Sequence, residues 1–179
     1  MNTMENVTST PEAPRSEEIK TILKERHLPG MHDAYIRQID NLATDGQLPF
    51  DERFFRLCFF ERSLRRNNGI QKRLKDARLY NPTACIEDLD TSNRTLNKEQ
   101  ILNLASCDYI QQKKHISIEG ATGTGKTYLA SALGNIACRR GYKTRYVRTP
   151  DLLNELLVAR RQGETSKVRS FYLKYDLII

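Results

Sequence analysis

The chain has 179 residues, of which 39% are hydrophobic and 28% are charged, and its formal net charge at pH 7 is +7. The length is enough for one ordinary domain, or for a small domain and part of another. The composition excludes collagen-like, low-complexity and wholly disordered proteins.

The start of the chain predicts neither a secretory signal nor a membrane anchor. Residues 1–15 hold Pro11 and Pro14 among Thr, Ser and Glu, a composition typical of a disordered lead-in. No stretch approaches the roughly 20 apolar residues that a membrane-spanning helix needs. We therefore expect a cytoplasmic protein with no membrane partner.

Three amphipathic helices are predicted in the first half of the chain. The first begins at Ser16, whose hydroxyl group can cap free amides, and ends at Leu28-Pro29-Gly30. The second follows this turn and closes at Asp45-Gly46, and the third begins near Phe50. Asn67-Asn68-Gly69 interrupts the third pattern, so the helix is expected either to kink there or to turn back.

The segment between Arg53 and Leu79 has nine basic and two acidic residues, which accounts for the whole net charge. An excess of this size is typical of a surface that binds a polyanion, with nucleic acid as the first candidate. A helix face that is basic only for solubility is the alternative, and the charge pattern does not decide between them. The residues that we expect to contact duplex DNA are Arg62, Arg65, Arg66, Lys72, Arg73 and Lys75.

A connector, residues 80–95, leads to a second half in which helices and strands alternate. Its predicted elements are a helix around Ile101, a strand His115–Ile118, a helix Thr127–Arg140, a strand Thr144–Arg148, a helix capped by Asp151, and a final strand Leu177–Ile179. This alternation predicts an α/β fold with a parallel sheet covered on both faces.

The four cysteines, Cys58, Cys85, Cys107 and Cys138, are widely separated and form no C-x-x-C pair. A zinc site is therefore not expected, and the cysteines are predicted to be small, reduced core residues.

Residues Gly120–Thr127 match the pattern G-x-x-x-x-G-K-[ST] between a predicted strand and a predicted helix. Glycines allow successive N–H groups to point at phosphate oxygens, and the helix start adds its positive dipole end. In such a site Lys126 reaches the β and γ phosphates, and the Thr127 hydroxyl group holds Mg²⁺. The predicted nucleotide-binding residues are Gly120, Ala121, Thr122, Gly123, Thr124, Gly125, Lys126 and Thr127, with Lys126 and Thr127 also assigned to catalysis.

The spacing of the glycines argues against a nicotinamide or flavin cofactor. Dinucleotide sites have G-x-G-x-x-G, whereas the glycines here run G-x-x-G-x-G and are followed directly by lysine. The loop does not identify the base, so ATP is the default nucleotide. A glycine-rich turn with an exposed lysine and no ligand is the structural alternative.

Several blocks of sequence resemble the IstB-like ATPases, transposition helper proteins of bacterial insertion sequences that are related to the helicase loader DnaC and the initiator DnaA. The resemblance covers nearly the whole chain from about Ile19. The blocks are Leu28-Pro29-Gly30-Met31, Phe50-Asp-Glu-Arg53, the basic run through Arg78, Ala84-Cys-Ile-Glu-Asp-Leu-Asp90, the loop Gly120–Thr127, Cys138-Arg-Arg-Gly141-Tyr and Asp151-Leu-Leu153-Asn-Glu-Leu156.

The resemblance implies an AAA+ ATPase with a helical N-terminal module before its P-loop core. Residues 16–90 would form the module, and residues 91–179 would form a truncated ATP-binding core. A protein of this kind uses ATP and Mg²⁺ to assemble on duplex DNA as a homo-oligomer, and it helps a partner transposase to choose its target.

The chain departs from the family at its last strand. The family's strand runs into the paired Walker B acids, whereas this chain reads Tyr175-Asp176-Leu177-Ile178-Ile179 and stops. We therefore expect it to bind ATP rather than to hydrolyse it. Two other readings stay open: a DnaC-like helicase loader in replication, and a P-loop kinase that acts on a small molecule.

Overall fold

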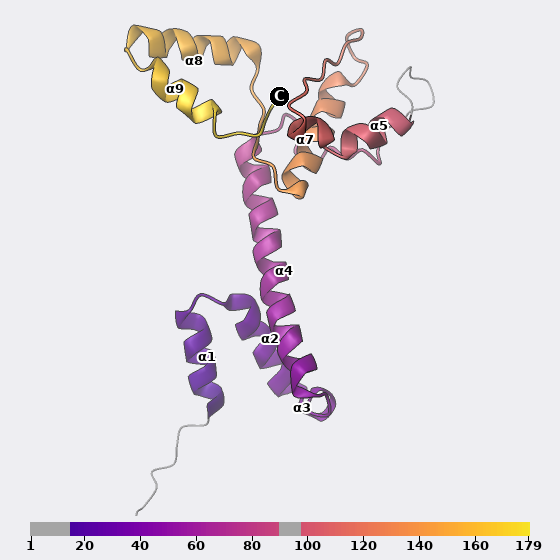
Figure 1. Cartoon of the computed structure of the whole chain (residues 1–179), viewed down its shortest axis with the longest axis vertical. Helices are drawn as coiled ribbons and strands as arrows, with labels where there is room; N and C mark the ends of the chain where they lie inside the picture. The colour runs from indigo at the N-terminus through magenta and orange to yellow at the C-terminus, as the bar shows by residue number, and fades with distance from the viewer. Residues whose placement is uncertain (1–14, 90–97) are drawn as a thin grey trace, which may run out of the picture. The chain divides into compact units, whose positions relative to one another are not determined.

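The computed structural model describes residues 15–89 and 98–179 (Figure 1). The chain divides into two compact units, Met1–Asn67 and Asn68–Ile179. The boundary falls inside one long helix, α4 (Phe50–Ala77). The division at residue 90 that the resemblance implies is a different one and stays a prediction, and the expected lead-in 1–14 lies outside the described residues.

Unit 1 is helical, as the sequence predicts. It contains α1 (Arg15–Glu25), α2 (Pro29–Asp40), the short helix α3 (Leu42–Asp45) and the first part of α4. The expected turn at Leu28-Pro29-Gly30 is instead the start of α2, because proline fits the first helical turn, where its missing N–H costs no hydrogen bond. Helix α2 also ends earlier than predicted, at Asp40 with Asn41 as its cap, and a separate turn of helix follows.

Helix α4 runs for 28 residues without a break at Asn67-Asn68-Gly69. The prediction of a turn back at this point is therefore wrong. Asn and Gly weaken a helix by up to about 1 kcal/mol per residue, and contacts elsewhere along a helix can outweigh that cost.

Glu61, on α4, has a buried carboxylate that holds unit 1 together. Its Oε2 atom accepts hydrogen bonds from the backbone N–H groups of Gly30 (2.8 Å) and Met31 (3.1 Å), in the first turn of α2. Arg65 donates to its Oε1 atom at 2.5 Å and also to the carbonyl oxygen of His27. Burial opposes ionisation of Glu61, but Arg65 and the two amides outweigh it and hold the pKa of this carboxyl group below its usual range.

Unit 2 contains the second part of α4 and most of the other elements. They are α5 (Lys98–Ala105), α6 (Asp108–Gln111), α7 (Lys126–Arg140), β1 (Thr144–Arg145), α8 (Thr149–Arg161), α9 (Thr165–Tyr172) and β2 (Leu177–Ile178). Helix α7 ends at Gly141, whose φ of 106° is a conformation that favours glycine. Asp151 lies in the first turn of α8, whose cap is Arg148, so the prediction of an Asp151 cap is wrong.

The described sheet has two parallel strands, with Thr144 opposite Leu177 and Arg145 opposite Ile178. The fold is therefore mostly helical with a small parallel sheet, a coarser form of the predicted α/β core. The predicted strand His115–Ile118 is wrong in this structure, since these residues have no strand assignment. A strand requires a hydrogen-bonded neighbour, and no described residue bonds to the backbone of this segment.

The core of unit 2 is built on close contact between α7 and the chain that follows α4. Ala77, Leu79 and Cys138 are buried together, with Tyr146 and Ile179 packed against them. All four cysteines are free, and Cys107 and Cys138 are buried as expected. Cys85 is only half-buried and Cys58 is exposed, so the prediction of a core position is wrong for Cys58 and met only in part by Cys85. Among the described residues no helix is both long and apolar enough to cross a lipid bilayer.

Candidate nucleotide site and basic segment

The loop Gly120–Thr127 leads directly into α7, a helix of 15 residues. Its glycines have φ angles of 154° (Gly120), 84° (Gly123) and 81° (Gly125), and other residues rarely adopt such angles. Space is free around Gly123, where an added Cβ atom would meet nothing within 4 Å. The glycines that the motif requires therefore stand where the backbone needs them.

Free amide groups gather at the start of α7. The backbone N–H groups of Gly123, Gly125, Lys126 and Thr127 have no acceptor within the described ranges. Gly125 occupies the cap position and supplies no side chain to bond them. Together with the positive end of the helix dipole, these donors form a site with the chemistry of a phosphate cradle.

Lys126 lies over the loop that precedes it. Its Nζ atom donates to the carbonyl oxygens of Gly120 (2.9 Å) and Ala121 (2.5 Å). The ammonium group is thus held beside the free amides, but its hydrogen bonds go to the protein. A phosphate group that enters the loop offers it a stronger, charge-assisted partner.

Two threonines complete the loop. Thr124 donates its hydroxyl hydrogen to the Ala121 carbonyl oxygen at 2.8 Å, which steadies the turn. Thr127 is exposed, and its hydroxyl group has no partner in the part of the chain that the structure describes. The donor set of the loop therefore fits a nucleotide phosphate, and the Thr127 oxygen is free to take a hard cation such as Mg²⁺.

A second feature of the site was not predicted from the sequence. The connector docks along one face of α7, immediately after the loop: Tyr128 accepts from the Cys85 N–H group (3.3 Å) and donates to Asp88 (3.4 Å). The same face bears Ser131, which accepts from the N–H of Asn81 (3.3 Å), and Asn135, which donates to the carbonyl of Pro82 (2.9 Å). Only the spacing of these three polar residues within an apolar helix could have indicated the contact.

The six predicted DNA contacts fall into two groups. Arg65 is bonded to Glu61 and to the His27 carbonyl oxygen in unit 1. Arg73 donates to the Cys138 carbonyl oxygen at 2.8 Å in unit 2. These two arginines have structural contacts and are poorer candidates for phosphate contacts.

The other four cations are exposed. In unit 1 the guanidinium group of Arg62 lies 5.5 Å from the centre of the Phe59 ring, and Arg66 has no hydrogen-bond partner among the described residues. In unit 2 Lys72 and Lys75 are likewise exposed and unpaired within the described ranges. Each can approach a phosphate without breaking a contact of the protein.

Comparison with known proteins gives the family. Residues 21–179 match the model of the IstB-like ATP binding proteins. A Pseudomonas fluorescens protein, named as an ATP-binding protein of insertion sequence IS1162, is 40% identical over 139 residues, which are 77% of this chain and 60% of that protein.

Two further relatives support this result. An insertion-sequence ATP-binding protein of Sinorhizobium fredii is 34% identical over 142 residues, 79% of this chain and 57% of that protein. The chromosomal replication initiator DnaA of Aquifex aeolicus is 34% identical over 82 residues, 46% of this chain and 19% of that protein, and it is a distant relative. The chain thus spans only about 60% of the insertion-sequence relatives, and it belongs to the family of IstB-like ATP-binding proteins.

Proposed function

We propose that this chain binds ATP with Mg²⁺ at the loop Gly120–Thr127 and acts as a DNA-associated helper protein of insertion-sequence transposition. The observation that carries the first part is the set of free amide groups at the start of α7, beside the Lys126 ammonium group. Backbone donors of this kind bind phosphate without any other catalytic group. Bound ATP would supply the phosphate charge that draws Lys126 away from the loop carbonyls.

The test is direct binding of a fluorescent ATP analogue, with unlabelled ATP as competitor. Lys126→Ala should abolish binding, because it removes the one side-chain cation of the loop. Lys174→Ala is the matched control, since Lys174 is exposed and lies outside the loop, and it should bind like the wild type. Equal binding by the wild type and Lys126→Ala would place the nucleotide elsewhere.

The role of Thr127 is tested by the metal. Thr127→Val removes the hydroxyl oxygen and keeps the shape of the side chain. We expect Mg²⁺ to strengthen ATP binding by the wild type and to strengthen it less in this variant. An equal effect of Mg²⁺ on both proteins would exclude the Thr127 oxygen as the ligand.

The association with duplex DNA rests on the exposed cations Arg62, Arg66, Lys72 and Lys75. Four phosphate contacts predict that log K falls with log salt at a slope of about −3.6, because each contact contributes about −0.9. The variant Arg66→Ala, Lys72→Ala, Lys75→Ala should flatten the slope by about 2.7. Removing three exposed cations elsewhere, by Arg160→Ala, Arg161→Ala and Lys174→Ala, should leave it unchanged.

Partners beyond DNA follow from what the relatives are named for. Two of them are ATP-binding proteins of insertion sequences, and a transposase is the enzyme that moves such an element. We expect the chain to associate with itself and with that transposase, and more strongly with ATP and DNA present. Light scattering measures the self-association, and co-precipitation with the transposase of the same element measures the second interaction. The absence of both interactions under all of these conditions would contradict the proposed partners.

A further inference from the structure

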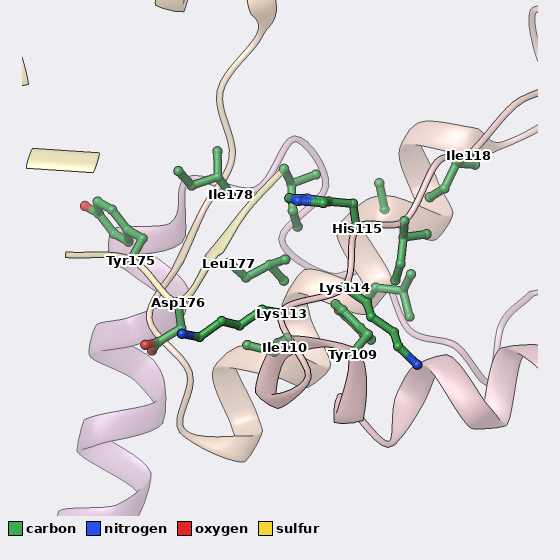
Figure 2. Close-up of a pocket in the computed structure, with 14 residues that line it drawn as sticks. Tyr109, Ile110, Lys113, Lys114, His115, Ile118, Tyr175, Asp176, Leu177 and Ile178 are labelled. Carbon is green, nitrogen blue, oxygen red and sulfur yellow. The ribbon is translucent and has the colours of Figure 1, made fainter. Parts of the chain in front are cut away.

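Apolar groups are uncovered in both units. In unit 2 Ile110, Leu177 and Ile178 line a pocket of about 480 Å³ beside β2 (Figure 2). These residues belong to the α/β core, so the pocket is a feature of that core. In unit 1 the uncovered groups are aromatic: five of the six phenylalanines of the chain are on α4, and each of the five is at least 43% exposed. Exposed rings gathered on one helix indicate a binding surface.

Two of these rings share a face of α4 with two arginines. In the order of the chain, these residues are Phe55, Phe59, Arg62 and Arg66, at gaps of 4, 3 and 4 residues, which place side chains on one face of a helix. The centres of the Phe55 and Phe59 rings are 6.0 Å apart. The Arg62 guanidinium group lies 5.5 Å from the centre of the Phe59 ring. We call these four residues the aromatic–arginine stripe.

The aromatic–arginine stripe lies away from α2. Glu61 marks the side of α4 that faces α2, because its carboxylate bonds the first turn of that helix. A helix rotates about 100° per residue, so Phe59 lies about 160° and Arg66 about 140° around α4 from Glu61. All four residues of the stripe are exposed. The stripe is therefore open to a ligand without any movement of α2.

The chemistry of the stripe indicates its ligand. The stripe lies within the segment that carries the whole positive charge of the chain, so the ligand should be anionic as well as able to cover rings. A protein helix would need apolar and acidic residues in matching order on one face. A DNA strand with unpaired bases supplies both everywhere, because each nucleotide has a planar base and a phosphate. In a duplex the neighbouring bases cover those planar faces.

We propose that the aromatic–arginine stripe binds single-stranded DNA. Bases stack on Phe55 and Phe59, and the guanidinium groups of Arg62 and Arg66 contact the phosphates. Arg62 also extends the stack, since a guanidinium plane can lie against a base as it lies against the Phe59 ring. This is a second mode of DNA binding beside the duplex contacts proposed above, and it does not depend on the nucleotide site.

The experiment separates bases from phosphates. A fluorescein-labelled oligothymidylate and an abasic oligonucleotide of the same length carry the same charge, but only the first has bases. We expect the wild-type chain to bind the oligothymidylate at least about 10-fold more tightly, because each base stacked on an aromatic ring contributes about 1–3 kcal/mol. Equal affinity for the two would overturn the proposal and leave only phosphate contacts. Binding of neither would also overturn it, whatever the result with duplex DNA.

Leucine variants test the location. Phe55→Leu with Phe59→Leu keeps apolar side chains but removes the rings, so it should lose the preference for bases and keep the affinity for the abasic strand. Phe50→Leu with Phe54→Leu is the matched control: these rings are also exposed and stacked, 5.8 Å apart, but they lie on the Glu61 side of α4. Circular dichroism verifies that both variants are folded. An equal loss of preference in the two variants, or none in the first, would overturn the assignment to the stripe.

Discussion

Different kinds of contact stabilise the interiors of the two units of this chain. In unit 1 a buried carboxylate, Glu61, bonds the start of α2 and an arginine of its own helix. In unit 2 the buried core around α7 is apolar, with Cys138 and Gly134 close to Leu79, and the charged groups Arg73 and Asp88 bond α7 from outside that core. Each unit also contains a glycine that permits a close approach, Gly30 in the first and Gly134 in the second. The comparison predicts that unit 1 depends on charge and pH and that unit 2 depends on shape.

The largest effect is expected from Glu61→Ala. It leaves the amide groups of Gly30 and Met31 without their acceptor and removes one of the two acceptors of Arg65, which should cost unit 1 about 3 kcal/mol of unfolding free energy. Hydrogen exchange of the α2 amides measures this cost. Glu52→Ala is the control, because its exposed ion pair with Arg56 should contribute less than about 1 kcal/mol. Equal losses in both variants would refute the central role of Glu61.

Gly30→Ala should cause the next largest loss of unfolding free energy. An added Cβ atom would lie 2.7 Å from the Cα atom of Glu61, and backbone atoms cannot move aside cheaply. We expect a loss of about 2 kcal/mol in the same measurement. Gly69→Ala, in the same helix as Glu61, should have the opposite effect. An added Cβ atom there would meet only the end of the Arg73 side chain, at 3.4 Å. Alanine should therefore stabilise α4 by up to about 1 kcal/mol.

A smaller loss is expected from Gly134→Ala in unit 2. The added Cβ atom would lie 2.6 Å from the Leu79 Cδ2 atom and 2.7 Å from the Ile179 Cδ1 atom, both at side-chain ends. Overpacking is partly offset by the better helix propensity of alanine, so the net loss should be about 1 kcal/mol. Adding Leu79→Val, which lacks that Cδ2 atom, should couple favourably with it. Strict additivity of the two changes would show that the contact is not the cause.

The smallest expected effect is the pH dependence of unit 1. The pKa of Glu61 is lowered in the folded chain, so its contribution is complete above its unfolded value of about 4.5 and is lost as pH falls through the folded pKa. Hydrogen exchange of α2 between pH 5 and about pH 3 should show this loss. The stability of Glu61→Gln should depend less on pH than that of the wild type. Identical pH dependence in the two proteins would show that Glu61 is not the titrating group.

The helices were the predictable part of the fold. Apolar spacing predicted α2 and α4, although Phe50, Phe54 and Phe60 on the apolar face of α4 are exposed. The Ser16 cap indicated α1, and the glycine loop before it indicated α7.

Local sequence did not predict the break at Asn41 or the continuation of α4 through Asn67-Asn68-Gly69. Asn and Gly weaken a helix by up to about 1 kcal/mol per residue, and the rest of a long helix can outweigh that cost. Helix α9 was not predicted, although its eight residues are amphipathic, and it packs against α8 (Figure 1). The prediction of a strand at His115–Ile118 was wrong because a strand also needs a hydrogen-bonded neighbouring strand.

The loop of the candidate site was predictable for a different reason. The positions of Gly120, Gly125 and Lys126 follow from the backbone conformation and charge that a phosphate requires, both of which are local. The docking of the connector on Tyr128 and the structural contacts of Arg65 and Arg73 join residues far apart in sequence. Charge alone could not separate these two arginines from the four cations that are exposed and free to bind phosphate.

The most direct measurement of the central claim is a titration of the ¹⁵N-labelled chain with ATP and Mg²⁺, followed amide by amide. We expect large shifts for the amides of residues 120–128, smaller shifts in the connector bonded to Tyr128, and none for α1 and α2 of unit 1. Lys126→Ala should lose these shifts, and Lys174→Ala should keep them. Saturable shifts in unit 1, with the loop amides unmoved, would contradict a nucleotide site at the start of α7.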